Sequence, residues 1–159
     1  MTLTTHVAIG AGIGVLMENP ALGFTLGVIS HFLVDMIPHG DTALVDRFYV
    51  QKERLIPVAY TTTDAVLAVM LLVFLGVIKP DSVSTIPFAM SVIGSVLPDL
   101  LVGIVDIFHK SKIGRAYYNF HFFFHDYFSR TYGDVNLKAA IAAQAVFVIL
   151  VVKLIYGLN

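Results

Sequence analysis

The chain has 159 residues, of which 57% are hydrophobic and 13% are charged, about half the charged share of an ordinary soluble domain. Its formal net charge is −1, and no basic patch points to a nucleic-acid partner. We therefore exclude a soluble enzyme and expect one all-α domain, residues 1–159, that is a polytopic integral membrane protein. Because the chain contains no Cys, any metal must be held by nitrogen and oxygen ligands.

Apolar segments follow one another along the chain. A helix needs about 20 apolar residues to cross about 30 Å of hydrocarbon. Five segments are predicted as transmembrane helices, and they comprise residues 4–17, 20–37, 57–78, 85–108 and 137–157. The first is only about 21 Å long, so it is either a span through a thin region or a partial span. No Lys or Arg precedes it, which argues against a cleaved signal peptide.

The first two segments carry glycines at four-residue spacing, Gly10 with Gly14 and Gly23 with Gly27. Small residues at this spacing let helices approach each other closely in lipid. We therefore predict close helix packing along both segments. The alternative interpretation is that these glycines serve only flexibility.

The two long loops, residues 38–56 and 109–136, indicate the orientation. With five spans, the N-terminus and both loops lie on one side, and eight of the ten Lys and Arg residues lie on that side. The positive-inside rule places this side in the cytoplasm. The second loop contains the run AYYNFHFFFHDYF, which predicts an aromatic interfacial helix.

Ionisable residues inside the spans gather in the cytoplasmic half. His31 and Asp35 are four residues apart, so they share a helical face and can bind one cation. Asp99 follows Pro98 in the middle of the fourth span, where the proline removes a backbone hydrogen bond. Asp64 lies at a comparable depth in the third span. We expect these side chains to converge on one polar site, because buried charges need a partner or a purpose.

The turn after the second span holds two more candidates. Pro38 ends that span and releases His39 and Asp41 into the turn. In one interpretation both residues belong to the site, with His39 as a metal ligand. In the other, Asp41 is the N-cap of an interfacial helix over residues 42–50 and His39 is a surface residue.

His121 and His125 repeat the four-residue spacing inside the aromatic run. On a helix they share a face, as the two His of an HExxH zinc motif do, but residue 122 is Phe and no Glu supplies the base. A functional pair and interfacial histidines among aromatic residues remain the two interpretations.

Three short motifs carry a family resemblance. They are Thr5-His6 before a Gly-rich span, the block Gly27-x-x-Ser30-His31-x-x-x-Asp35-x-x-Pro38-x-Gly40, and Gly94-Ser95-x-Leu97-Pro98-Asp99. These motifs resemble those of the YdjM-like inner-membrane, metal-dependent hydrolases, with the order of the last two blocks reversed. The resemblance implies that His6, His31, Asp35 and Asp99 bind a metal or lie next to it. It also implies a phosphate or other ester substrate at the membrane surface.

These observations predict a site for a divalent cation, Zn²⁺ or Mn²⁺, that hydrolyses an ester or phosphoester, with membrane lipids as partners and possible substrates. The predicted metal ligands are His6, His31, Asp35, His39 and Asp99. The residues predicted to transfer the proton are Asp64, His121 and His125. Two alternatives stay open, an ion or proton transporter and a non-catalytic membrane scaffold.

Overall fold

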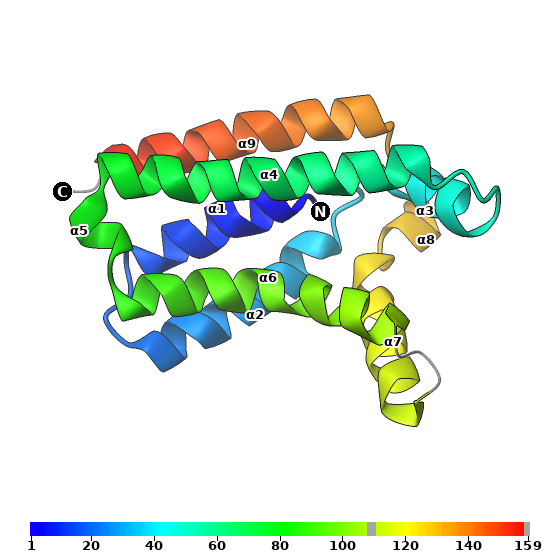
Figure 1. Ribbon diagram of the computed structural model, residues 1–159, viewed down its shortest axis with the longest axis horizontal. Helices are drawn as coiled ribbons and strands as arrows, with labels where there is room; N and C mark the ends of the chain where they lie inside the picture. The colour runs from blue at the N-terminus through cyan, green and yellow to red at the C-terminus, as the bar shows by residue number, and fades with distance from the viewer. Residues whose placement is uncertain (108–110, 158–159) are drawn as a thin grey trace.

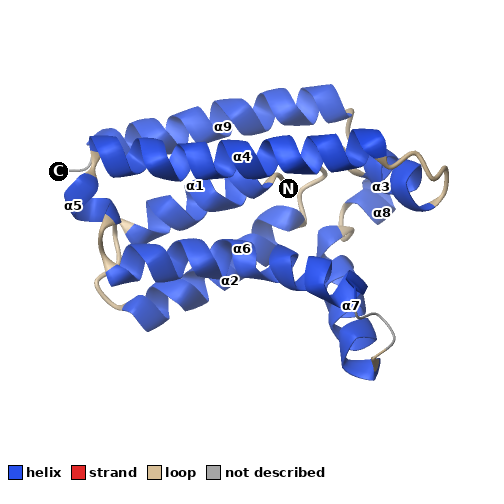
Figure 2. Cartoon of the chain, in the orientation of Figure 1, coloured by secondary structure: helices blue, strands red, loops and turns tan. Residues whose placement is uncertain are grey.

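A computed structural model describes residues 1–107 and 111–157, and within them every regular element is a helix (Figures 1 and 2). The five main helices are α1 (Leu3–Gly14), α2 (Pro20–Asp35), α4 (Leu55–Ile78), α6 (Ile86–Ile107) and α9 (Leu137–Gly157). The shorter ones are α3 (Thr42–Tyr49), α5 (Pro80–Val83), α7 (Lys112–His125) and α8 (Ser129–Tyr132). The all-α prediction is confirmed. The predicted end of the fourth span at residue 108 and the start of the following loop lie outside the described residues.

Helix length separates the five main helices into two groups. Three of them, α4, residues Ile86–Val105 of α6, and α9, are long and apolar enough to cross a membrane. Helices α1 and α2 have 12 and 16 residues, so they measure about 18 and 24 Å. Both are apolar but shorter than about 30 Å of hydrocarbon. Length and composition therefore mark three spans within the described residues, where five were predicted.

The main helices run roughly along the long axis of the molecule (Figure 1). Helix α6 packs against α1 and α2, and α1 also packs against α4 and α9. Helices α3, α7 and α8 gather at one end, whereas α5 and the end of α9 lie at the other. The outward side chains of α4 and α9 are apolar, with Val73 62% and Ile149 65% exposed. A bundle with such surfaces is suited to lipid rather than to water.

Glycines let α2 and α6 approach each other at backbone distance. A Cβ added at Gly27 would lie 2.4 Å from the carbonyl oxygen of Ser91, and one added at Gly94 would lie 2.3 Å from that of Phe24. Glycines in α1 and α2 face α6 in the same way, and they are Gly10, Gly14 and Gly23. The close packing predicted from the glycine spacing is confirmed, and it holds the polar parts of α2 and α6 side by side.

Helix α1 begins inside the bundle rather than at its end. The Asp64 carboxylate on α4 accepts hydrogen bonds from the backbone N–H groups of Leu3 and Thr4. The Gln144 side-chain oxygen on α9 accepts one from the N–H of Thr2 at 2.8 Å. These bonds satisfy donors that the first turn of a helix leaves free. Because Asp64 lies nine residues after the start of α4, α1 begins about 14 Å along that helix.

The turn before α3 is held by Asp134, a residue distant in the sequence. Asp41 occupies the N-cap position of α3, but its side chain makes no capping hydrogen bond. The Asp134 carboxylate instead accepts from the N–H groups of Gly40 at 2.8 Å and Thr42 at 3.1 Å. His39 is only 5% exposed, so its interpretation as a surface residue is wrong. The Asp41 carboxylate is thereby left to face other side chains.

Candidate metal centre

Four side chains from three helices meet at the hollowed end of the bundle. His31 and Asp35 come from α2, Asp99 from α6 and His121 from α7, and one ligand atom of each lies within 4.8 Å of the others. Nε2 of His31 is 3.4 Å from Oδ2 of Asp35 and 3.7 Å from Oδ1 of Asp99. Nε2 of His121 is 3.8 Å and 3.6 Å from the same two oxygens. We call these four residues the inner cluster.

The spacing of the inner cluster suits a shared ion. Ligand atoms about 2.0–2.1 Å from a tetrahedral metal ion lie about 3.3–3.4 Å from one another. The four nitrogen-to-oxygen distances of the inner cluster, 3.4 to 3.8 Å, are slightly longer than this. Two imidazoles and two carboxylates form a donor set that Zn²⁺ and Mn²⁺ both accept. A small contraction would bring all four atoms to bonding distance.

The ring of His31 is held in one orientation. Its Nδ1 donates to the carbonyl oxygen of Ser95 at 2.9 Å, and the side chain is fully buried. Because the hydrogen resides on Nδ1, Nε2 carries a lone pair that faces both carboxylates of the inner cluster. Histidines that bind metals are typically fixed in this way by a bond to the other ring nitrogen.

Unsatisfied polar atoms test whether the inner cluster fits a cation. Nε2 of His31, Oδ2 of Asp35 and Nδ1 of His121 are buried and have no hydrogen-bond partner. A buried polar atom without a partner costs about 1–3 kcal/mol, so native proteins rarely tolerate several in one place. A cation in contact with the first two atoms would satisfy both of them. The residues present therefore fit a divalent metal ion.

His6, on α1, lies next to the two carboxylates of the inner cluster. Its Nε2 lies 3.1 Å from Oδ1 of Asp35 and 3.9 Å from Oδ2 of Asp99, the oxygens other than those that face His31 and His121. Its ring stacks on that of His31 with centroids 4.2 Å apart. The structure thus places His6 against the inner cluster, within hydrogen-bond distance of the Asp35 carboxylate alone, and its role as a metal ligand stays a prediction.

A second group of ligand atoms adjoins the first. Asp35, His39 and His125 each offer one atom within 4.8 Å of the others. Oδ2 of Asp41 lies 3.3 Å from Nε2 of His39 and 3.1 Å from Nε2 of His125. We call these four residues the outer cluster. The amino group of Met1 also contacts it, donating to the Asp35 carboxylate and lying 2.7 Å from Nε2 of His39.

Electrostatics in the outer cluster favour positive charge. Burial opposes protonation of His125, but its hydrogen bonds with Asp126 and Asp41 prevail and raise its pKa to about 10. Burial also opposes ionisation of Asp41, yet its contacts with His125 and His39 hold its pKa well below the usual range. Carboxylates that stabilise a protonated imidazole stabilise a metal cation for the same reason.

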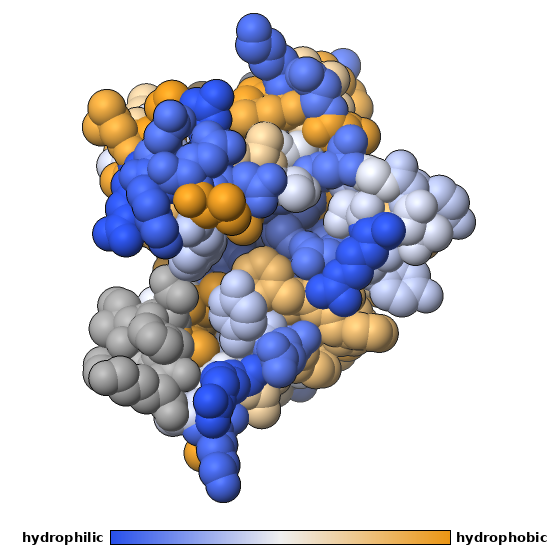
Figure 3. All heavy atoms as spheres, turned by 90° about the vertical axis from the view of Figure 1, so that its right-hand side faces the viewer, coloured by the Kyte–Doolittle hydropathy of each residue, from blue (hydrophilic) through white to orange (hydrophobic). Residues whose placement is uncertain are grey.

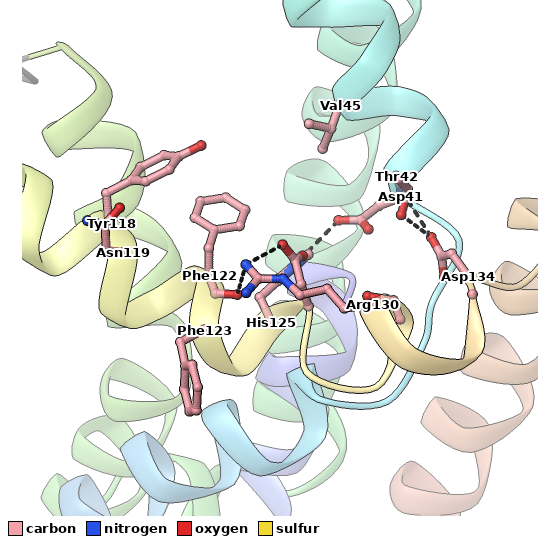
Figure 4. Close-up of a pocket in the computed structure, with 13 residues that line it drawn as sticks. Asp41, Thr42, Val45, Tyr118, Asn119, Phe122, Phe123, His125, Arg130 and Asp134 are labelled. Atoms are coloured by element: carbon pink, nitrogen blue, oxygen red, sulfur yellow. Dashed lines mark hydrogen bonds and ion pairs between the residues drawn. The ribbon is translucent and has the colours of Figure 1, made fainter.

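The outer cluster borders an open cavity of about 750 Å³. Figure 3 looks onto this end of the molecule, where hydrophilic residues surround a hollow. The cavity lining includes Asp41 and His125, which Figure 4 shows joined by a dashed line, together with Asp126, Arg130 and Asp134. Arg130 is paired with Asp126 at 3.2 Å. Water and small solutes can therefore reach Asp41 and His125 of the outer cluster.

Asp64 lies apart from both clusters. Its carboxylate accepts from the N–H groups of Leu3 and Thr4 and from the Thr4 hydroxyl, which is 2.6 Å from Oδ1. These bonds make it a cap for α1. The predicted role of Asp64 in proton transfer stays a prediction, whereas His121 and His125, predicted for the same role, each lie in one of the clusters.

No protein-family model, no curated protein and no solved structure matched the chain. The residues of the site therefore provide the evidence for its function.

One contributor to the site escaped the sequence analysis, whereas another was left open. Asp41 was interpreted either as a functional residue of the turn or as a helix cap, and its carboxylate faces His39 and His125. Tyr117, one turn before His121, donates its hydroxyl hydrogen to the Pro98 carbonyl at 2.9 Å and so joins α7 to α6. The sequence signal for this contact is a hydroxyl four residues before His121, together with a proline inside the preceding span, where carbonyl groups need a donor.

Proposed function

We propose that this chain is a membrane-embedded, metal-dependent hydrolase that acts on an ester or phosphoester at the cytoplasmic membrane face. The inner cluster is the observation that carries the proposal. It joins two imidazoles and two carboxylates from three helices, and it leaves buried ligand atoms without partners. The motif resemblance to YdjM-like hydrolases agrees with this proposal.

The membrane arrangement belongs to the same proposal. We place α1 and α2 in the membrane beside α4, α6 and α9, as two short helices packed against α6. The end that carries α3, α7 and α8 then faces the cytoplasm, because seven of the nine Lys and Arg residues that the structure describes lie on that side. In this orientation the inner cluster lies below the cytoplasmic surface, within reach of lipid headgroups.

A second cavity supports a lipid substrate. It measures about 510 Å³ and lies between the end of α2 and the start of α9. Its lining combines His39 with the apolar residues Val34, Ile37, Ala143 and Phe147. A lipid whose ester or phosphate group lies at the outer cluster could place an acyl chain in this cavity.

The chemistry follows from the donor set. A divalent ion bound at the inner cluster supplies a Lewis acid for a carbonyl or phosphoryl oxygen and lowers the pKa of water. His31 holds its lone pair toward the ion position through its bond to Ser95. His6 keeps the Asp35 carboxylate in place at 3.1 Å. Asp99, with a side chain 32% exposed, is the member of the inner cluster most accessible to substrate.

Metal content and hydrolysis, measured on the same preparations, test the proposal. Four proteins are purified in detergent: wild type, His31→Ala, Asp99→Ala and the control Asp81→Asn. Asp81 lies in α5, at the opposite end of the bundle. We expect stoichiometric Zn or Mn in wild type and control, lost in both cluster variants. We also expect hydrolysis of a fluorogenic phospholipid or carboxylic ester that parallels metal content. A wild type that binds metal but hydrolyses no ester or phosphoester would overturn the hydrolase and leave ion transport. Absence of metal would overturn the hydrolase as well and leave a proton transporter or a scaffold.

A further inference from the structure

We propose that the outer cluster binds a second divalent cation, so that Asp35 is shared between two ions. This inference rests on the proposed function for the first ion, which the inner cluster would hold. The outer cluster contributes His39, Asp41 and His125, and its connection to the inner cluster is the Asp35 carboxylate.

His39 and His125 direct their Nε2 atoms toward each other. Nδ1 of His39 lies 2.7 Å from the carbonyl oxygen of Ile37 and donates to it. Nδ1 of His125 lies 2.9 Å from Oδ1 of Asp126. Both rings therefore direct Nε2 away from these partners, and the two Nε2 atoms lie only 3.2 Å apart. Two imidazole lone pairs repel at this distance unless a cation or a proton lies between them.

Asp41 completes a triangle of ligand atoms. Its Oδ2 lies 3.1 Å from Nε2 of His125 and 3.3 Å from Nε2 of His39. All three sides of the triangle, 3.1 to 3.3 Å, approach the separation of about 3.3 Å between ligands of a tetrahedral zinc ion. This triangle is thus closer to metal-ligand spacing than the inner cluster, and Asp35 lies within 4.8 Å of its two histidines.

Asp35 is placed to serve both clusters at once. Its Oδ2 faces His31 and His121 at 3.4 and 3.8 Å, and the same carboxylate belongs to the outer group with His39 and His125. The positive amino group of Met1 lies between Asp35 and His39, so a cation is already stabilised at this spot. A divalent ion at the outer cluster would replace that ammonium group as the positive charge.

The neighbouring cavity explains what a second ion would do. Its lining holds the carboxylates of Asp41, Asp126 and Asp134, and the guanidinium group of Arg130 is paired with Asp126. With three carboxylates against the Arg130 guanidinium group and the His125 imidazole, this lining disfavours an anionic ester unless a further cation adds positive charge. An outer ion would supply that charge where substrate enters, and two-ion sites of this kind clamp phosphoryl oxygens.

Metal stoichiometry separates the two ions. The full chain is loaded with Mn²⁺ alone in detergent, and bound metal is measured by elemental mass spectrometry for wild type, His125→Ala, His31→Ala and the control Asp81→Asn. We expect about two ions per chain in wild type and control, and about one in His125→Ala, with the inner ion retained. About one ion in wild type, unchanged in His125→Ala, would overturn the inference and leave the proposed function intact.

A spectroscopic measurement on the wild-type protein provides an independent test of the shared carboxylate. Electron paramagnetic resonance of wild-type protein loaded with Mn²⁺ should show an exchange-coupled pair, because both ions contact Asp35; a spectrum of isolated Mn²⁺ ions at full loading would contradict the shared carboxylate. This measurement needs no variant, so a misfolded His125→Ala protein does not decide the outcome. Two coupled ions without phosphoester or ester hydrolysis would uphold the second site and overturn the hydrolase instead.

Discussion

The carbonyl oxygen of Ser95 fixes the imidazole of His31 through a hydrogen bond of 2.9 Å. Ser95 lies on α6, three residues before Pro98, and His31 lies on α2, at the close approach that Gly27 and Gly94 permit. Helix packing thus sets the orientation of a ligand nitrogen. Because the ring is buried and already oriented, a cation can bind without ordering that side chain further.

Gly27→Ala tests the packing that supports this arrangement. A Cβ there would lie 2.4 Å from the Ser91 carbonyl oxygen, so α2 and α6 must separate. We expect the free energy of unfolding to fall by about 1–3 kcal/mol, together with weaker metal binding. Gly103→Ala is the matched control, because a Cβ at Gly103 meets no atom within 4 Å. Equal thermal stability of the two variants in detergent would contradict the packing argument.

Tyr117→Phe tests the joint between α7 and α6. The variant removes the 2.9 Å hydrogen bond to the Pro98 carbonyl, and His121 lies one turn further along α7. We expect a loss of about 1 kcal/mol in stability and about a tenfold weaker affinity for the metal, because the His121 ring is less well held. Competition with a chromophoric chelator measures the affinity. The control is Tyr156→Phe on the exposed face of α9, and a similar loss of affinity there would show that Tyr117 has no specific role.

Part of this site could be predicted from periodicity and depth. The spacing of His31 and Asp35 placed both on one helical face, and the structure puts their facing atoms 3.4 Å apart. Asp99 was predicted at a similar depth from a different span, and it joins them. The glycine spacing predicted the close packing of α1 and α2, which face α6. These features depend only on positions along single helices.

The other features of the site depend on how the helices pack against one another, which residue spacing along a single helix does not predict. Asp64 has a depth comparable to that of Asp99, but depth does not specify rotation about the bundle axis, and its carboxylate meets the start of α1 instead. His121 reaches the inner cluster only because α7 turns back against α2 and α6. Asp41 is free to face His125 because Asp134, distant in sequence, binds the N–H groups beside it.

Asp64→Asn distinguishes the observed capping role from the predicted proton transfer. An amide retains an acceptor but loses the negative charge that favours the N-terminus of α1. We expect the free energy of unfolding to fall by about 1–2 kcal/mol with metal content retained. Thermal unfolding and metal analysis measure both quantities, with Asp81→Asn as the control. A variant of normal stability and metal content whose kcat collapses would instead assign the proton to Asp64.

Asp134 makes the stability of the turn around α3 dependent on pH. Burial tends to raise its pKa, but hydrogen bonds from Thr42, Gly40 and Val135 outweigh this and lower the pKa below the ordinary value. A carboxylate with a lowered pKa stabilises the fold fully above its unfolded pKa of about 3.9. That contribution is lost as the pH falls through the lower, folded pKa.

Asp134→Asn should therefore destabilise the protein at neutral pH and matter progressively less in acid. Unfolding of wild type and variant is followed between about pH 7 and pH 3, and the quantity compared is the difference between the two. Other carboxylates, such as Asp126, whose pKa is also lowered, act equally in both proteins and cancel in that difference. We expect the difference to be constant at neutral pH and to shrink below about pH 4. A difference that does not change with pH would show that the hydrogen bonds of Asp134 do not require its charge.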